Sequence, residues 1–117
     1  MPGDESPADL PADLFALLDD EYARDILAAT SQRPMSAPTL AEVCDASRST
    51  VYRRIERLKD LDLVAETTVP DDDGHHRHVY AARFDELTVR LVDGEYRLSV
   101  RRRDDPADRF TGMWESI

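Results

Sequence analysis

Apolar and polar residues follow two different periods along this chain. Between Pro11 and Leu61 the apolar residues recur every three to four positions, a spacing that predicts amphipathic helices. From Leu63 onward they alternate with polar residues at every second position, which predicts strands. Helices followed by hairpins predict an α+β fold.

Helical spacing divides the first part of the chain into consecutive segments. The first begins at Pro11, and we expect Asp19 to cap the point where it breaks and restarts, because its side chain can accept from free backbone N–H groups. The next helix is capped either by Ser36 or by Pro38-Thr39. A further helix, capped by Ser47, is predicted over residues 47–58 with a possible extension to Leu61.

Two hairpins are predicted after these helices. Residues 63–69 and 78–82 have strand composition, and the segment between them, 70–74, contains proline, three aspartates and glycine, which is typical of a turn. A second hairpin is centred on Asp93-Gly94, since a type I′ turn needs positive φ at both central residues.

The two ends of the chain differ in composition. We expect residues 1–9 to form a disordered acidic tail, because they contain almost nothing to bury. At the other end, Asp105-Pro106 has the pattern of a helix start. The residues that follow place one apolar stripe on a short terminal helix, at spacing i, i+3, i+4 and i+7: Phe110, Met113, Trp114 and Ile117.

The charge balance is strongly acidic and has an unusual composition. The 117 residues carry a formal charge of −10, with 14 arginines but a single lysine, Lys59. Surfaces rich in Asp and poor in Lys are typical of proteins in concentrated salt, where a Debye length of about 3 Å at ~1 M screens such an excess. We therefore expect a protein of an extreme halophile; the alternative is an ordinary acidic protein.

Several classes of protein are disfavoured by the sequence. No apolar run approaches the ~18 residues of a membrane span, and the N-terminal residues lack a secretory signal, so we expect a cytoplasmic protein without membrane contact. Cys44 is the only cysteine, which rules out an intramolecular disulfide. No catalytic constellation or phosphate-binding glycine loop is present, so we predict neither an enzyme nor a cofactor.

One predicted helix is basic. Residues 46–59 carry five basic side chains and one acidic side chain, a net charge of +4, so the remaining residues sum to −14. Val51, Ile55 and Leu58 cluster on one side of this helix, and Ser49, Arg53 and Arg57 fall roughly opposite. A locally basic helix in an acidic chain indicates a binding site for a polyanion.

The residues around this helix resemble a known family. Residues 39–58 read TLAEVCDASRSTVYRRIERL, a short helix, a tight turn and a second helix that are similar to the helix-turn-helix of winged-helix transcription regulators. The following RLKDLDLVAE resembles the end of a recognition helix that enters the first wing strand, and the 64–82 hairpin resembles the wing. Asp45 departs from the usual turn glycine, although Asp can adopt the left-handed conformation at modest cost. The chain as a whole resembles the haloarchaeal regulators of the ArsR/PadR-like superfamily, without the paired cysteines of ArsR-type metal sensors.

The resemblance implies a winged helix-turn-helix over residues 10–82, followed in the same compact unit by an extra C-terminal β-hairpin and terminal helix over 83–117. It implies sequence-specific binding to double-stranded DNA with helix 47–58 in the major groove and the wing at the neighbouring backbone or minor groove. The residues expected at DNA are Arg48, Ser49, Thr50, Tyr52, Arg53, Arg57, His76 and Arg77. The alternative is a winged-helix protein-interaction module that does not bind DNA.

We also predict a homodimer, because a single winged helix reads too few base pairs for useful specificity. We assign the dimer contacts to apolar residues near the chain ends, and we expect potassium ions at the DNA interface because acidic residues crowd its rim. The predicted dimerisation residues are Leu14, Leu18, Phe110, Met113, Trp114 and Ile117.

Three weaker signals remain open in the sequence. His76 and His78, with Asp73 and the neighbouring His75, could hold a divalent metal in a metal-responsive regulator or a small metal-dependent enzyme, or could form a polar tip that contacts phosphates. Cys44 could be a redox switch or a buried apolar residue. Arg101 to Arg103 could extend the DNA footprint or pair with acidic neighbours.

Overall fold

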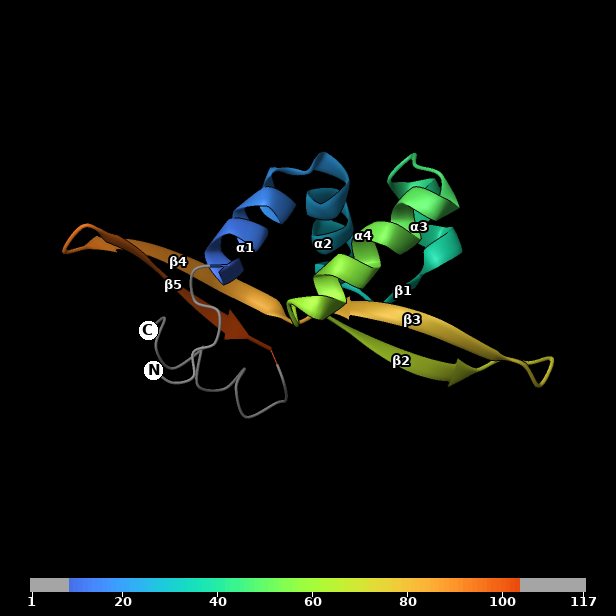
Figure 1. Cartoon of the computed structure of the whole chain (residues 1–117). Helices are drawn as coiled ribbons and strands as arrows, with labels where there is room; N and C mark the ends of the chain where they lie inside the picture. The colour runs from blue at the N-terminus through green and yellow to red at the C-terminus, as the bar shows by residue number, and fades with distance from the viewer. Residues whose placement is uncertain (1–8, 104–117) are drawn as a thin grey trace.

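A computed structural model describes residues 9–103, which form helices packed on one side of two hairpins that point in opposite directions (Figure 1). The predicted α+β winged helix-turn-helix with an extra hairpin is confirmed. The predicted terminal helix and residues 1–8 of the predicted tail lie outside the described residues, whereas residue 9, the last of that predicted tail, begins α1. The elements are α1 (Asp9–Asp19), α2 (Glu21–Gln32), β1 (Met35–Ser36), α3 (Ala37–Val43), α4 (Arg48–Asp60), β2 (Val64–Pro70), β3 (His76–Ala82), β4 (Phe84–Val92) and β5 (Glu95–Arg102).

The break between α1 and α2 is capped one residue later than predicted. Asp20, in extended conformation, accepts from the backbone N–H of Ala23 at 2.8 Å, so Asp20 and not Asp19 is the N-cap of α2. Its carboxylate also accepts from Arg54 Nε at 2.8 Å, and the Arg54 guanidinium lies 5.8 Å from the centre of the Tyr22 ring. The cap therefore fastens α4 to the start of α2.

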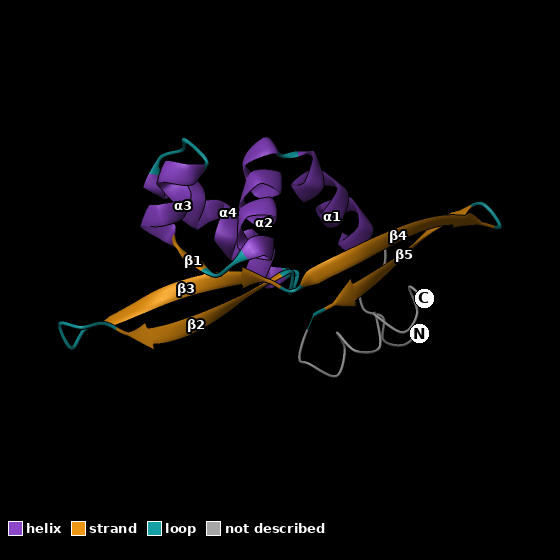
Figure 2. Ribbon diagram, turned by 180° about the vertical axis from the view of Figure 1, so that it is seen from behind, coloured by secondary structure: helices purple, strands orange, loops and turns teal. Residues whose placement is uncertain are grey.

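The wing is part of a three-stranded antiparallel sheet of order β1-β3-β2. The two-residue strand β1 was not predicted; it pairs Met35 with Tyr80 and Ser36 with Val79. Because Ser36 also caps α3 through the backbone N–H of Thr39, β1 sets where the helix-turn-helix begins relative to the wing. Figure 2 shows the helices on one face of this sheet from the rear.

A single apolar core joins the helices to the base of the wing. Among the described side chains, the largest fully buried ones come from α1 to α4 and from the residue before β2. Their burial fixes the rotation of α4 about its axis, because three of them are on its inner face. These residues are Leu17, Ile26, Leu40, Val51, Ile55, Leu58 and Leu63.

The second hairpin is attached to the core by arginines. Arg102 donates to the carbonyl oxygens of Asp62 at 2.8 Å and Leu61 at 3.2 Å, just after α4, and Arg103 donates to the Ser31 carbonyl at 3.3 Å. Arg101 pairs with Asp85 and Glu86 within the hairpin. The basic run 101–103 thus makes intramolecular contacts that position β4 and β5.

Asp20 gives a stability prediction that separates its two roles. Asp20→Ala removes both the cap and the partner of Arg54 and should lower the free energy of unfolding by about 1–2 kcal/mol. Asp20→Asn keeps a good capping residue and loses only the charge, so its loss should be smaller. Urea denaturation of the two variants at neutral pH measures both values; equal losses would mean that the cap contributes nothing.

The pH dependence has a definite sign. The hydrogen bond from Arg54 holds the pKa of Asp20 below its ordinary value. The stabilisation is therefore present above the unfolded-state pKa of about 3.9 and is lost as the pH falls through the lower folded-state value. The difference in the free energy of unfolding between wild type and Asp20→Asn should therefore become smaller as the pH falls over that acidic range.

Candidate nucleic-acid interface

Three short polar contacts set the angle between α3 and α4. Ser36 caps α3, and Ser47 caps α4 by accepting from the backbone N–H of Thr50 at 3.1 Å. Between them Asp45 takes a positive φ of 53°, the left-handed conformation expected of this turn residue. The backbone N–H of Ala46 donates to the Ala41 carbonyl at 3.0 Å and closes the turn. The predicted helix-turn-helix geometry is therefore present.

The outer face of α4 is polar and exposed. Val51, Ile55 and Leu58 are at most 1% exposed, so the residues on the opposite side project away from the core. Five of the predicted DNA-contacting side chains are exposed on this helix, and Tyr52 keeps 47% of its surface accessible. These five are Arg48, Ser49, Tyr52, Arg53 and Arg57.

The hydroxyl groups at the start of α4 are bonded to one another. Ser47 Oγ donates to Thr50 Oγ1 at 2.9 Å and lies 3.2 Å from Ser49 Oγ. Thr50 is half-buried, whereas Ser49 is exposed. Because the first backbone N–H groups of α4 are arranged around this cluster, the helix N-terminus presents partial positive charge beside the exposed arginines.

The two arginines in the second half of α4 have different surroundings. Arg54 is held by Asp20, as described above, and its side chain is 22% exposed. Arg57, which the sequence placed with Arg53, is exposed and lines a hollow with Asp13 and Leu17 of α1. Asp60 lines the same hollow, so Arg57 has acidic neighbours on its own chain.

The strand register puts the two predicted wing contacts on opposite faces. His76 and His78 share the face of Tyr80, which is buried against the core, whereas Arg77 points to the other face. His78 Nδ1 lies 2.7 Å from Glu66 Oε2, and Lys59 of α4 donates to Glu66 Oε1 at 2.6 Å. The Lys59 ammonium holds the pKa of Glu66 below its usual value.

The remaining open signals have clear positions. Within residues 9–103 no group of three or more His, Cys, Asp and Glu side chains is arranged to hold a metal ion. Cys44 is half-buried at the end of α3, and burial raises the pKa of its thiol, which lowers the thiolate fraction needed for redox chemistry.

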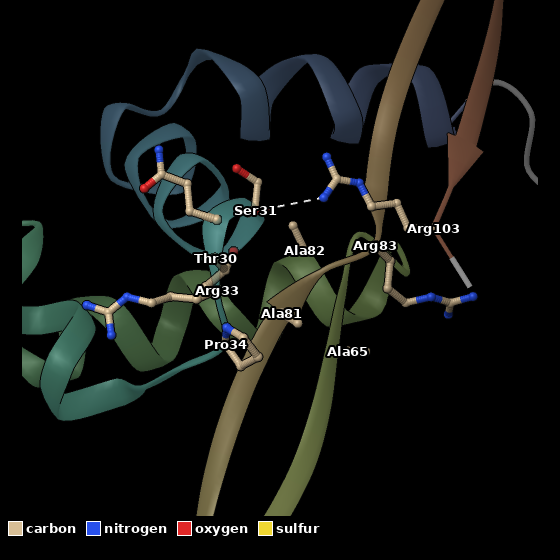
Figure 3. Close-up of a pocket in the computed structure, with 10 residues that line it drawn as sticks. Thr30, Ser31, Arg33, Pro34, Ala65, Ala81, Ala82, Arg83 and Arg103 are labelled. Atoms are coloured by element: carbon tan, nitrogen blue, oxygen red, sulfur yellow. Dashed lines mark hydrogen bonds between the residues drawn. The ribbon is translucent and has the colours of Figure 1, made fainter. Parts of the chain in front are cut away.

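A hollow of about 310 Å³ lies between the end of α2 and the base of the wing (Figure 3). Three arginines line it, but only Arg103 points toward the end of α2, where it bonds Ser31. Arg33 and Arg83 direct their guanidinium groups away from that bond. The three cations therefore diverge and do not form a shared anion-binding site.

One exposed residue near the interface was not predicted. Val43, the last residue of α3, is 55% exposed immediately before the turn. An apolar side chain in this position can contact a thymine methyl group or the sugar edge of a groove. Its position directly before the Cys44-Asp45 turn was the signal available in the sequence.

Comparison with known proteins agrees with this geometry. A family model described as a helix-turn-helix domain matches residues 18–67, which include α2, α3, the turn, α4 and the start of β2. This part of the chain is therefore similar in sequence to a helix-turn-helix domain, in agreement with the geometry of α3, the turn and α4. No curated protein matches the sequence. Among the described residues, no helix has both the length and the apolar character needed to cross a membrane.

Proposed function

We propose that this protein is a sequence-specific transcription regulator that binds double-stranded DNA as a homodimer, with the N-terminal half of α4 in the major groove. The observation that carries this proposal is the exposed, arginine-bearing face of α4, held in helix-turn-helix geometry in a chain of net charge −10. An arginine in the groove can bind guanine through two hydrogen bonds, which supplies direct readout.

Composition supports a more specific setting for this function. The excess of Asp over Lys fits a cytoplasmic regulator of a halophilic archaeon, similar to the ArsR/PadR-like superfamily, that works in concentrated potassium salt. Acidic residues near the DNA rim would then be accompanied by potassium ions. Of the predicted contacts, we assign base readout to Arg48, Ser49, Tyr52 and Arg53, and backbone contacts to Thr50, His76 and Arg77, with Arg57 at the margin.

The dimer contacts need revision from those first predicted. Leu14 is 2% exposed and packs inside its own subunit, and Leu18 packs against the same core, so α1 does not offer Leu14 to a second copy. The other predicted dimerisation residues, between Phe110 and Ile117, lie outside the described residues. We retain them as dimer contacts, opposed by a surface other than Leu14 of α1.

Gel-shift titration at molar KCl tests DNA binding directly. The probe is the DNA upstream of the protein's own gene, and the control is a scrambled duplex of equal length and base composition. We expect retardation of the first duplex at protein concentrations that leave the second free. Failure to retard any duplex from low to molar KCl would contradict the proposal and favour a protein-docking role.

A further inference from the structure

The β4–β5 hairpin has one continuous apolar face. In a two-stranded antiparallel ladder, directly paired residues share a face, and alternate residues along each strand do so too. Thr88 and Ser99 form a polar pair on the opposite face. The apolar face consists of the three cross-strand pairs Leu87–Val100, Val89–Leu98 and Leu91–Tyr96.

Only the inner half of this face is covered. Leu98 and Val100 pack against the core and, with Leu14 of α1, line an apolar hollow of about 200 Å³. Toward the tip, Leu91 is 65% and Tyr96 63% exposed, and the hairpin extends beyond α1 (Figure 1). The outer half is therefore an open apolar surface, and a two-stranded hairpin without cover is only marginally stable in water.

The charge of the hairpin distinguishes it from the rest of the chain. Residues 84–102 contain four acidic residues and four arginines, a net charge of zero, whereas residues 9–32 of α1 and α2 sum to −5. An acidic segment of another copy therefore meets less electrostatic repulsion at this hairpin than at α1 and α2. A neutral apolar surface on an acidic protein is suited to contact between copies.

We propose that the outer apolar face of β4–β5 binds the C-terminal segment, residues 106–117, of a second copy of this chain. The segment begins shortly after β5 ends at Arg102, and its predicted helix of 12 residues would be about 18 Å long. The stripe from Phe110 to Ile117 supplies apolar side chains that can cover the open face.

The direction in which the chain leaves β5 favours the second copy over the same subunit. Arg103 continues past the strand, its backbone N–H donates to the Arg83 carbonyl at 2.5 Å, and its guanidinium donates to the Ser31 carbonyl at the end of α2. Because β5 runs from Glu95 at the hairpin tip to Arg102 at its base, the chain leaves the strand at the end opposite its own tip. Reaching that tip would require the chain to reverse direction.

This inference rests on the proposed homodimer and specifies its contact. Reciprocal exchange of the two terminal segments gives a closed two-fold dimer in which each copy covers the other's hairpin. In this arrangement the apolar stripe from Phe110 to Ile117 faces the hairpin of the other copy and not Leu14 of α1. The DNA-binding face of α4 takes no part in the contact, so dimerisation and DNA binding can be tested separately.

Trp114 is the only tryptophan of the chain and lies in the proposed segment, so its fluorescence reports on docking without a label. In the full-length protein at molar KCl we expect the blue-shifted emission of a buried indole and weak quenching by acrylamide. Sedimentation equilibrium should show a dimer. On dilution below the dimer dissociation constant, emission should shift to the red together with the appearance of monomer.

Charged substitutions on the two faces of the hairpin form a matched pair of tests. Leu91→Lys, or Tyr96→Lys, should shift Trp114 emission to the red, raise acrylamide quenching several-fold and convert the dimer to monomer. Thr88→Lys and Ser99→Lys add the same charge on the opposite face and should leave all three readouts unchanged. Deletion of residues 106–117 should also give a monomer, with a far-UV spectrum that shows the remaining helices intact.

Three results would overturn the proposal. Water-exposed Trp114 in a wild-type dimer would mean that the segment is undocked, and buried Trp114 in a monomer would place it on its own subunit. The contact would also lie elsewhere if Leu91→Lys and Tyr96→Lys left both the dimer and the Trp114 emission maximum unchanged. Circular dichroism must show that these variants are folded. None of these readouts involves DNA, so each is distinguishable from a failure of the DNA-binding proposal.

Discussion

Arg53→Ala is expected to weaken binding to the cognate DNA by about 1–3 kcal/mol and to relax the sequence preference at one base position. Arg53 is exposed in the first half of α4, on the side opposite the buried residues of that helix. A guanidinium that binds a guanine edge through two hydrogen bonds loses both when it is truncated, and neighbouring residues cannot replace that geometry. Binding titrations against a library of single-base operator variants measure affinity and preference together.

The adjacent Arg54 provides the matched control. Arg54→Ala removes the same charge from the same helix, but its guanidinium is bonded to Asp20 and stacked near Tyr22. We expect Arg54→Ala to lower the free energy of unfolding and to leave the base preference unchanged. If Arg53→Ala altered neither affinity nor preference, α4 would not enter the groove as proposed.

The second large effect concerns salt. Neutralising four phosphates with arginines would make log K fall with log[salt] at a slope of about −3.6, a loss of roughly four decades between ~0.2 M and ~3 M. A regulator in a cell that contains molar potassium needs a shallower dependence. Asp71, Asp72 and Asp73 at the wing tip offer a cause, because carboxylates brought near phosphate take up cations as the arginines release them.

Changing Asp71, Asp72 and Asp73 together to Asn should therefore tighten binding at low KCl and steepen the negative slope. Asn can preserve the tip, where Asp71 Oδ1 accepts from the backbone N–H of Asp72 at 2.7 Å. The measurement is a KCl titration of DNA affinity at constant temperature, for wild type and variant.

A control variant separates local from overall charge. Glu86→Gln, Asp93→Asn and Glu95→Gln remove the same three charges from the β4–β5 hairpin, which points away from the wing (Figure 1). We expect this variant to keep the wild-type slope. Identical slopes for the wing variant and wild type would show that the wing acids do not tune binding, and equal changes in both variants would indicate an effect of net charge alone.

Local signals were sufficient to predict most elements of the fold. Ser47 caps α4 as expected, and Asp93 and Gly94 have φ of 54° and 80°, as a type I′ turn requires. Strand β1 could not be recognised, because two residues show no period, and it exists only through its pairing with β3. The cap at Asp20 was missed by one residue, since adjacent aspartates are equivalent until the helix axis is fixed.

The sequence was sufficient to predict those features of the candidate site that depend on α4 alone. The rotation of α4 follows from Val51, Ile55 and Leu58, and so does the exposure of Arg53. The surroundings of Arg57 include Asp13 and Leu17 of α1, and no local pattern encodes this tertiary proximity. In the same way, the backbone carbonyls that bind Arg102 and Arg103 come from residues 40 or more positions earlier.

The arginine contacts of the second hairpin have a consequence for the DNA sequences that a dimer could recognise. Arg102 bonds the carbonyls that directly follow α4, and Asp62 at that point also pairs with Arg83. These contacts hold the base of the hairpin against the C-terminal end of α4. In a dimer whose terminal segments hold the two hairpins at a fixed distance, the separation of the two α4 helices would be nearly constant. Inserting about five base pairs between half-sites would rotate one of them to the opposite side of the duplex, where a rigid dimer cannot follow.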